Sequence, residues 1–229
     1  MDIYYETYGH GPTVICLHGN QENRKIFYQL KDDLQDAYQL ILIDSRYHGK
    51  SVKSGELSLT QMAKDVMSVA DACQLDSYDV IGFSDGANVA LTLSGMDQRL
   101  KSAILLAPNS CPQGIKGFYR FSMGLTLVLL IPFCIYNKVA RRKYKLTKWM
   151  LKEPHFDAEY LHSIKIPCLV LSGDRDMIKD SDLKFFTDSL PHAIHQIIAD
   201  SSHFMLEDGY TQTLKKIRGF LYANNSENK

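Results

Sequence analysis

The chain has 229 residues, of which 45% are hydrophobic and 23% charged, a composition typical of a folded globular protein and not of a disordered or fibrous one. Its 26 basic residues balance 26 acidic ones, which excludes the basic excess of a nucleic-acid-binding domain. Five scattered cysteines without a C-x-x-C pair argue against a disulfide framework or a structural zinc, and the first residues lack the features of a signal peptide. We therefore expect a single cytoplasmic domain over residues 1–229.

Short apolar runs and amphipathic segments alternate along the chain and predict strands and helices in turn. The first elements are strands over residues 3–8 and 13–17, a helix over 26–34, a strand over 40–43 and a helix that begins with a capping box at Ser58 and Gln61. A strand over 78–83, a helix starting at 87 and a strand over 102–107 follow. The last elements are a strand over 167–171, a helix over 182–190, a strand over 195–198 and a closing helix over 204–222. We expect the first two strands to pair as an antiparallel hairpin. The rest predicts an α/β fold, with a mostly parallel sheet and helices on both faces.

The alternation breaks between residues 109 and 163, which indicates an insertion. Within it, residues 123–136 are almost wholly apolar, but the run is shorter than the about 20 residues of a membrane-spanning helix, and Pro132 interrupts it. We expect no transmembrane segment, and instead a buried or interfacial helix. Six basic residues follow it: Lys138, Arg141, Arg142, Lys143, Lys145 and Lys148. They form either a solvated helix face or a surface for an anionic substrate or for peripheral contact with an anionic membrane.

The most specific motif is the G-x-S-x-G of residues 82–86, which lies between a predicted strand and a predicted helix. A serine on such a sharp turn needs small residues two positions before and after it, because the backbone is crowded. The helix that starts behind it favours developing negative charge. The motif predicts that Ser84 is a nucleophile.

A serine needs a base and an orienting acid, and both follow Ser84 in the order acid, then histidine. His203 comes directly after the last predicted strand, and Asp174 and Asp176 follow the strand before it. The carboxyl ends of parallel strands meet at one edge of a sheet, so these side chains are expected beside Ser84. Only one aspartate can face the histidine, and the other would cap the next helix or pair with Arg175.

Four stretches resemble the α/β-hydrolase fold family, and the resemblance covers nearly the whole chain. They are L-H-G-N at 17–20, D-S-R-Y-H-G-K-S at 44–51, the elbow at 82–86 and S-H-F at 202–204. Two positions depart from the family pattern, since Tyr47 and Ser202 stand where glycine is usual.

The resemblance implies a catalytic triad of Ser84, Asp176 and His203, because the family's G-x-x-D pattern selects the second aspartate. It also implies an oxyanion hole formed by the backbone N–H groups of Asn20 and Asp85. A serine nucleophile implies an acyl-enzyme and an ester or related acyl substrate with an apolar portion, with no metal or organic cofactor.

The resemblance further implies that the insertion, about residues 110–162, is a helical lid over the carboxyl edge. Its aromatic residues would contact the apolar part of the substrate or pack the lid onto the body; the candidates are Phe118, Phe121, Phe133 and Tyr136. Two alternatives use the same fold: a small-molecule receptor or signalling adaptor with slow or no turnover, and a thioesterase or carbon–carbon bond hydrolase. The sequence carries no signal for an oligomeric state.

Overall fold

A computed structural model describes residues 2–226, in which seven strands form one sheet of order β1-β3-β2-β4-β5-β6-β7. The strands are β1 (Tyr5–Tyr8), β2 (Thr13–Leu17), β3 (Gln39–Ile43), β4 (Tyr78–Phe83), β5 (Leu100–Leu106), β6 (Cys168–Gly173) and β7 (Ala193–Ile198). All neighbours run parallel except β1, which is antiparallel to β3. The predicted mostly parallel α/β sheet is confirmed.

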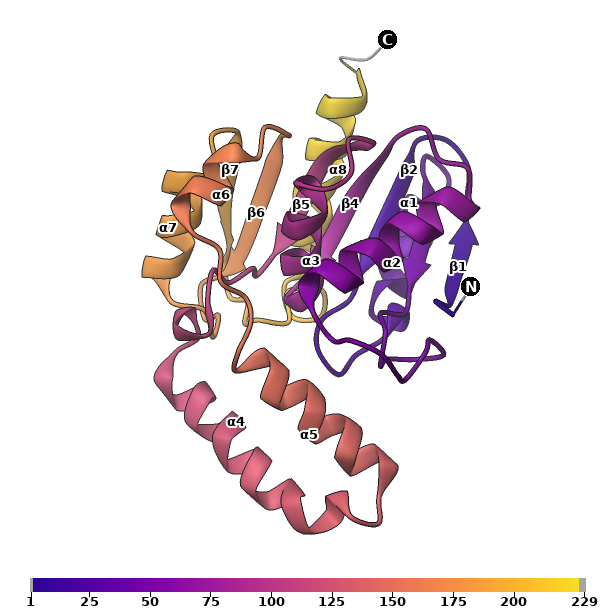
Figure 1. Ribbon diagram of the computed structural model, residues 1–229. Coiled ribbons are helices and arrows are strands. Elements are labelled where there is room, and N and C mark those ends of the chain that lie inside the picture. The colour runs from indigo at the N-terminus through magenta and orange to yellow at the C-terminus, as the bar shows by residue number, and fades with distance from the viewer. Residues whose placement is uncertain (1, 227–229) are drawn as a thin grey trace.

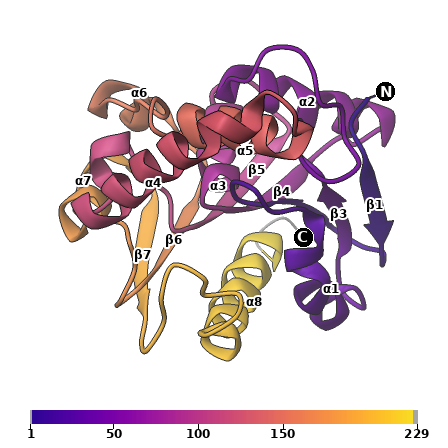
Figure 2. The same cartoon turned by 90° about the horizontal axis from the view of Figure 1, so that it is seen from below.

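Helices cover both faces of the sheet (Figures 1 and 2). They are η1 (Arg24–Phe27), α1 (Tyr28–Leu34), α2 (Leu59–Ala72), α3 (Asp85–Ser94), α7 (Asp180–Ser189) and α8 (Tyr210–Ser226). Apolar side chains of α2, α3 and α7 pack on one face, and those of α1 and α8 on the other. The strand β3 contributes to both clusters, with Ile41 and Ile43 on one side and Leu40 and Leu42 on the other. Burial on both faces explains its unbroken apolar sequence.

The predicted hairpin of the first two strands is wrong, because β3 lies between β1 and β2. The turn that joins them contains Gly9 and Gly11, whose φ angles of 71° and 101° suit glycine. A Cβ on either would collide with backbone carbonyl oxygens of Gln35 or Ala37, just before β3. The turn therefore presses against the start of β3 and carries the chain from one side of that strand to the other.

The closing helix begins at Tyr210 and not at Phe204 as predicted. Residues 204–209 form turns instead, and the Asp208 carboxylate accepts hydrogen bonds from the Ser201 hydroxyl (2.7 Å) and the Ser202 N–H (2.9 Å). The Asp208 side chain thus holds the loop that follows β7 and leads to His203.

The segment between β5 and β6 contains η2 (Pro112–Gly114), α4 (Gly117–Leu130), η3 (Ile131–Cys134), α5 (Lys138–Met150) and α6 (Ala158–Ser163). We call residues 117–150 the helical hairpin, because α4 and α5 lie side by side in opposite directions and project away from the sheet (Figure 1). No side chain of α4 is buried, so the alternative of a buried helix is wrong. Within residues 2–226, Gly117–Cys134, with a mean hydropathy of 1.5, is the one segment apolar and long enough to cross a membrane.

A buried ion pair joins the end of β3 to the segment after β2. The Asp44 carboxylate is fully buried and accepts from the Arg24 guanidinium (2.8 Å), the Arg24 N–H (2.9 Å) and the Lys50 N–H (2.8 Å). Arg24 also donates to Glu6 at 2.7 Å, which lowers the pKa of that carboxyl to about 2. Asp44, the first residue of the D-S-R-Y-H-G-K-S stretch, therefore has a structural role in the fold.

Asp44→Asn should lower the free energy of unfolding by about 3 kcal/mol, because it removes half of the charge that balances the buried Arg24. Urea denaturation followed by circular dichroism measures the change. Asp188→Asn is the matched control, since its ion pair with Lys184 is exposed and should contribute less than about 1 kcal/mol. Equal effects of the two substitutions would contradict a structural role for Asp44.

Candidate active site

Ser84 lies on a strained turn between β4 and α3, with φ 53° and ψ −117°. A side-chain-bearing residue adopts this conformation only where its surroundings impose it. The Ser84 N–H donates to the Leu106 carbonyl at 2.8 Å, which ties the turn to the end of β5. A Cβ on Gly82 would collide with the backbone of Gly86, and a Cβ on Gly86 would collide with the Leu17 carbonyl. Both glycines of the motif are therefore required by packing.

The structure brings Ser84, His203 and Asp176 together at the carboxyl edge of the sheet. His203 Nε2 lies 3.0 Å from Ser84 Oγ, and His203 Nδ1 lies 2.8 Å from Asp176 Oδ1. All three residues are buried, with exposed fractions of 9%, 5% and 2% in the order serine, histidine, aspartate. The Ile178 N–H also donates to Asp176 Oδ1 at 3.0 Å, so the carboxylate is held in place before any ligand binds.

Asp174 does not reach His203. Its carboxylate accepts from the N–H groups of Asp200 (2.9 Å) and Ser201 (3.1 Å), and it lies 3.9 Å from the Arg175 guanidinium. Asp174 thus closes the loop after β7, and Asp176 is the aspartate that faces the histidine.

The two residues predicted to form the oxyanion hole lie on segments next to Ser84, since Asp85 follows it in the chain and Asn20 follows Gly19. Gly19 permits the approach of the loop, because a Cβ there would lie 3.1 Å from the Ser84 Cβ. Within residues 2–226, the N–H groups of Asn20 and Asp85 have no acceptor in the protein. Both are therefore available to a developing negative charge.

Two buried histidines hold the loops around this position. His18 Nε2 accepts from the Ser45 N–H at 3.0 Å while its Nδ1 donates to the Gly19 carbonyl at 2.7 Å. His48 Nε2 likewise accepts from the Gln21 N–H at 3.0 Å. Burial lowers the pKa of His18 to about 4 and that of His48 to about 3. Both rings are therefore neutral, and they hold the loops by hydrogen bonds and do not compete with His203 as bases.

Sequence reasoning missed two carboxyls beside the serine. The Asp85 side chain accepts from the Asn20 amide at 2.8 Å, and Glu22 accepts from the Gly19 N–H at 3.0 Å. Burial raises the pKa of Asp85 to about 6 and that of Glu22 to about 7. Asp85 lies in the first turn of α3, where an acid normally indicates an exposed partner of the helix dipole, so the sequence offered no signal for its burial.

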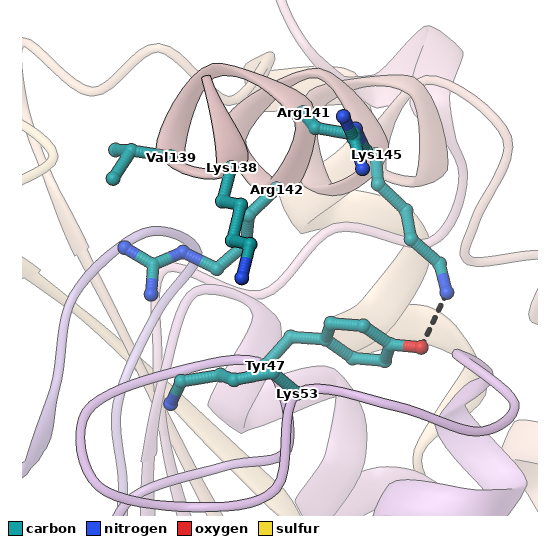
Figure 3. Close-up of a pocket in the computed structure, with 7 residues that line it drawn as sticks. All are labelled: Tyr47, Lys53, Lys138, Val139, Arg141, Arg142 and Lys145. Atoms are coloured by element: carbon teal, nitrogen blue, oxygen red, sulfur yellow. Dashed lines mark hydrogen bonds between the residues drawn. The ribbon is translucent and has the colours of Figure 1, made fainter. Parts of the chain in front are cut away.

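Tyr47, which replaces the family's usual glycine, adopts a φ of 66°, a region that favours glycine. Its hydroxyl donates to the Gly55 carbonyl at 2.6 Å, and the Lys145 ammonium lies 4.0 Å above its ring and bonds its hydroxyl (Figure 3). The cavity beside it has a volume of about 450 Å³. The remaining residues that line this cavity are Lys53, Lys138, Val139, Arg141 and Arg142. Part of the basic cluster therefore faces the body near the loop that borders Ser84.

The four predicted lid aromatics are not brought to the triad. Phe118, Phe121, Phe133 and Tyr136 are 60–90% exposed along the helical hairpin. Among the described residues, the rings in contact with His203 are those of Phe83, at 5.1 Å, and Phe204, at 5.7 Å between centroids. These two residues come from the elbow and from the loop after the histidine.

Comparisons with known proteins bear on the family and the fold. Residues 12–126 match the family described as alpha/beta hydrolase fold. The chain is 34% identical over 93 residues to the AB hydrolase superfamily protein YisY of Bacillus subtilis, a match that spans 40% of this chain and 35% of that protein. It is 24% identical to the pimeloyl-(acyl-carrier protein) methyl ester esterase of Salmonella typhi, over 88% of this chain and 91% of that one. An esterase from Exiguobacterium antarcticum has a similar structure, with a TM-score of 0.81 and 18% identity over 96% of this chain and 95% of that chain.

Glu22→Gln should make stability less sensitive to pH. Glu22 has an ordinary pKa of 4.5 when unfolded and about 7 when folded, so only the folded chain holds this proton between those values. The contribution of Glu22 to stability is therefore lost as the pH rises through this range. The free energy of unfolding of the variant, relative to the native chain, should rise by about 3 kcal/mol from about pH 4 to pH 8.

Urea denaturation across this pH range measures the difference. Glu56→Gln, at an exposed carboxyl, is the control and should give a flat difference. A flat difference for Glu22→Gln as well would contradict the burial of its carboxyl.

Proposed function

Because the chain belongs to the alpha/beta hydrolase fold family, we propose that it is a serine hydrolase acting on a small or medium ester or related acyl compound through an acyl-enzyme on Ser84. The observation that carries the proposal is the hydrogen-bonded series from Ser84 Oγ to His203 (3.0 Å) and from His203 to Asp176 (2.8 Å), built on a strained elbow. Its geometry is that of a nucleophile, a base and an orienting acid.

In the first half of the reaction, Ser84 Oγ attacks the ester carbonyl as His203 Nε2 takes the hydroxyl proton. Asp176 accepts a hydrogen bond from His203 Nδ1–H, which keeps Nε2 free to act as the base and stabilises the imidazolium. The carbonyl oxygen becomes negative and is placed to accept from the N–H groups of Asn20 and Asp85. Removing one such donor typically costs about 3 kcal/mol of transition-state stabilisation in comparable enzymes.

His203 then protonates the leaving alcohol, which departs and leaves the acyl group on Ser84. A water molecule enters, gives a proton to His203 and attacks the acyl carbonyl. His203 then returns this proton to Ser84 Oγ as the bond between Oγ and the acyl carbon breaks, and the carboxylic acid is released. Apart from the substrate and water, every group in these steps belongs to the chain, so the proposed reaction uses no metal or organic cofactor.

The proposal includes the insertion as a lid, and its contacts with two loops of the site support this role. Lys116, just before α4, donates from its ammonium to the Asp176 carbonyl and from its N–H to the Met177 carbonyl at 2.8 Å. On α5, Thr147 accepts from the Gln21 amide at 3.2 Å, next to Asn20. A shift of the insertion would therefore act on both the acid loop and the oxyanion loop. An apolar lid suits an ester with an apolar portion, and the Salmonella relative is named as a methyl ester esterase.

A second candidate is a receptor or signalling protein with slow turnover, and the carboxyls of Asp85 and Glu22 favour it. When ionised they repel an oxyanion held between Asn20 and Asp85, which slows acyl transfer. Pre-steady-state kinetics separates the two candidates: a hydrolase completes many turnovers, whereas a receptor stops after one burst per chain. A panel of esters, thioesters and vinylogous diketones then separates an esterase from a thioesterase or a carbon–carbon bond hydrolase.

Ser84→Ala should lower kcat/KM for short p-nitrophenyl esters at least about 1,000-fold, because the nucleophile is removed. Ser172→Ala is a matched control, since Ser172 Oγ also lies 2.8 Å from a histidine, His195, but without an elbow or an acid. Its rate should stay within about twofold of the native rate. A fluorophosphonate probe should label the native chain and Ser172→Ala but not Ser84→Ala. Full activity in Ser84→Ala would exclude the proposal.

Asp176→Asn should lower kcat about 1,000- to 10,000-fold with little change in KM, because the amide favours the wrong histidine tautomer. Asp174→Asn should change kcat less than about tenfold, since Asp174 bonds only backbone N–H groups of the next loop. In the native chain kcat/KM should fall as the pH is lowered, because an imidazolium cannot accept the serine proton. The reverse ranking of the two variants would assign the acid to Asp174.

A further inference from the structure

The outward side of α4 is an apolar stripe that nothing in the described chain covers. Its members recur three or four residues apart on the helix, and their exposed fractions run from 49% to 77%: Phe118, Phe121, Leu125, Val128 and Leu129. The half-exposed residues Met123, Leu127 and Leu130 lie on the other side of the helix, which packs against α5. A soluble surface rarely keeps so large a continuous apolar area without a binding role.

The far end of the helical hairpin continues this surface. We call this end the apolar apex; its residues are 55–90% exposed and consist of Ile131, Phe133, Ile135, Tyr136 and Val139. In Figure 1 the apex is the part of the chain most distant from the sheet. It is therefore accessible to a flat surface that the body would not reach.

The helical hairpin is also strongly cationic. It carries seven basic residues and no acidic one, namely Arg120, Lys138, Arg141, Arg142, Lys143, Lys145 and Lys148. No carboxylate of residues 2–226 forms an ion pair with any of them. Because the whole chain has 26 basic and 26 acidic residues, the remainder has a net charge of −7 when the hairpin's +7 is set aside. An anionic surface would attract the hairpin and repel the body, and so orient the molecule.

We propose that the helical hairpin docks on an anionic lipid bilayer. The apolar apex and the apolar stripe enter the interfacial layer, and the exposed cations nearest the apex, Lys138 and Arg141, lie at the level of the lipid phosphates. Lysine and arginine suit this position, since their long stems stay in apolar surroundings while their charges reach the phosphates.

Two other arrangements fit the charges less well. Crossing the bilayer would draw the packed α5 and its cations into the hydrocarbon, which is strongly unfavourable. Pairing of two copies through this face would set two hairpins of charge +7 against each other. An acidic protein would satisfy the charges but would not need an exposed apolar apex.

Sedimentation of the full chain with lipid vesicles tests the proposal. Binding to vesicles of phosphatidylcholine with phosphatidylglycerol should be at least tenfold stronger than to phosphatidylcholine alone, and should weaken steeply as salt is added. The Ser84→Ala chain should bind equally well, so the result stands apart from the proposed catalytic function.

Two sets of variants separate the apolar and the electrostatic contributions. Replacing Leu125, Val128 and Leu129 together by Gln should lower binding at least tenfold at every lipid composition. Replacing Lys138 and Arg141 by Gln should lower binding at least tenfold on anionic vesicles only. The matched control combines Ile194→Gln and Lys184→Gln, exposed apolar and basic positions on the body, and should bind like the native chain. Circular dichroism verifies that each variant is folded.

Several results would overturn the proposal. One is the absence of binding to anionic vesicles at low salt; another is unchanged binding of the Leu125, Val128 and Leu129 variant. Binding that resists alkaline carbonate would show a spanning segment instead of a docked one. Light scattering that detects a dimer, dissociated by the same triple variant, would assign the apolar stripe to contacts between copies. Equal affinity for polyglutamate and for anionic vesicles would assign the surface to acidic proteins.

Discussion

The close approach of the α3 N-terminus to β2 is the constraint on which the site depends. Gly86 lies against the Leu17 carbonyl with no room for a side chain, and this contact sets α3 deep against the centre of the sheet. The chain can then pass from β4 into α3 only through the strained backbone of Ser84, which raises the hydroxyl above the carboxyl edge. Because β6 and β7 run parallel to β4 in the same sheet, the loops that follow them deliver Asp176 and His203 to the same edge.

Buried polar groups keep the surrounding loops in place without adding a competing base. His18 and His48 each use one ring nitrogen as donor and the other as acceptor, so neither has a lone pair left for a substrate proton. Asp44 performs a similar role for the segment after β3 through Arg24 and Lys50. Rigid loops matter here because oxyanion donors stabilise a transition state only when they are already aimed at it.

The sequence predicts those parts of the fold that depend on local or continuous patterns. The strand at 40–43 falls within β3 because a strand buried on both faces needs a continuous apolar run, and the elbow is recognised because its glycines are required by packing. The choice of Asp176 depended on the family resemblance, since Asp174 differs only in its distant backbone partners. The pairing of β1 with β3 and the burial of Asp85 and Glu22 depend on contacts between segments far apart in the sequence, which periodicity does not report.

The balanced charge of the chain conceals a strong separation between its two parts. The helical hairpin has seven cations, and the rest of the chain has an equal excess of anionic residues. Near the site, the hairpin contacts the body through hydrogen bonds such as those of Gln21 with Thr147 and Tyr47 with Lys145. The side chains of α4 are all at least partly exposed, so this helix gains little free energy from packing on the body. Its position therefore depends on these polar contacts and on what covers its apolar side. The first of these contacts ends at the loop that carries Asn20, and the second ends at the loop that follows β3. A surface that moves the hairpin therefore acts on the loops around Ser84 more than on the sheet, because among the described residues the core clusters contain one buried hairpin residue, Trp149, and Met123 packs against the same cluster.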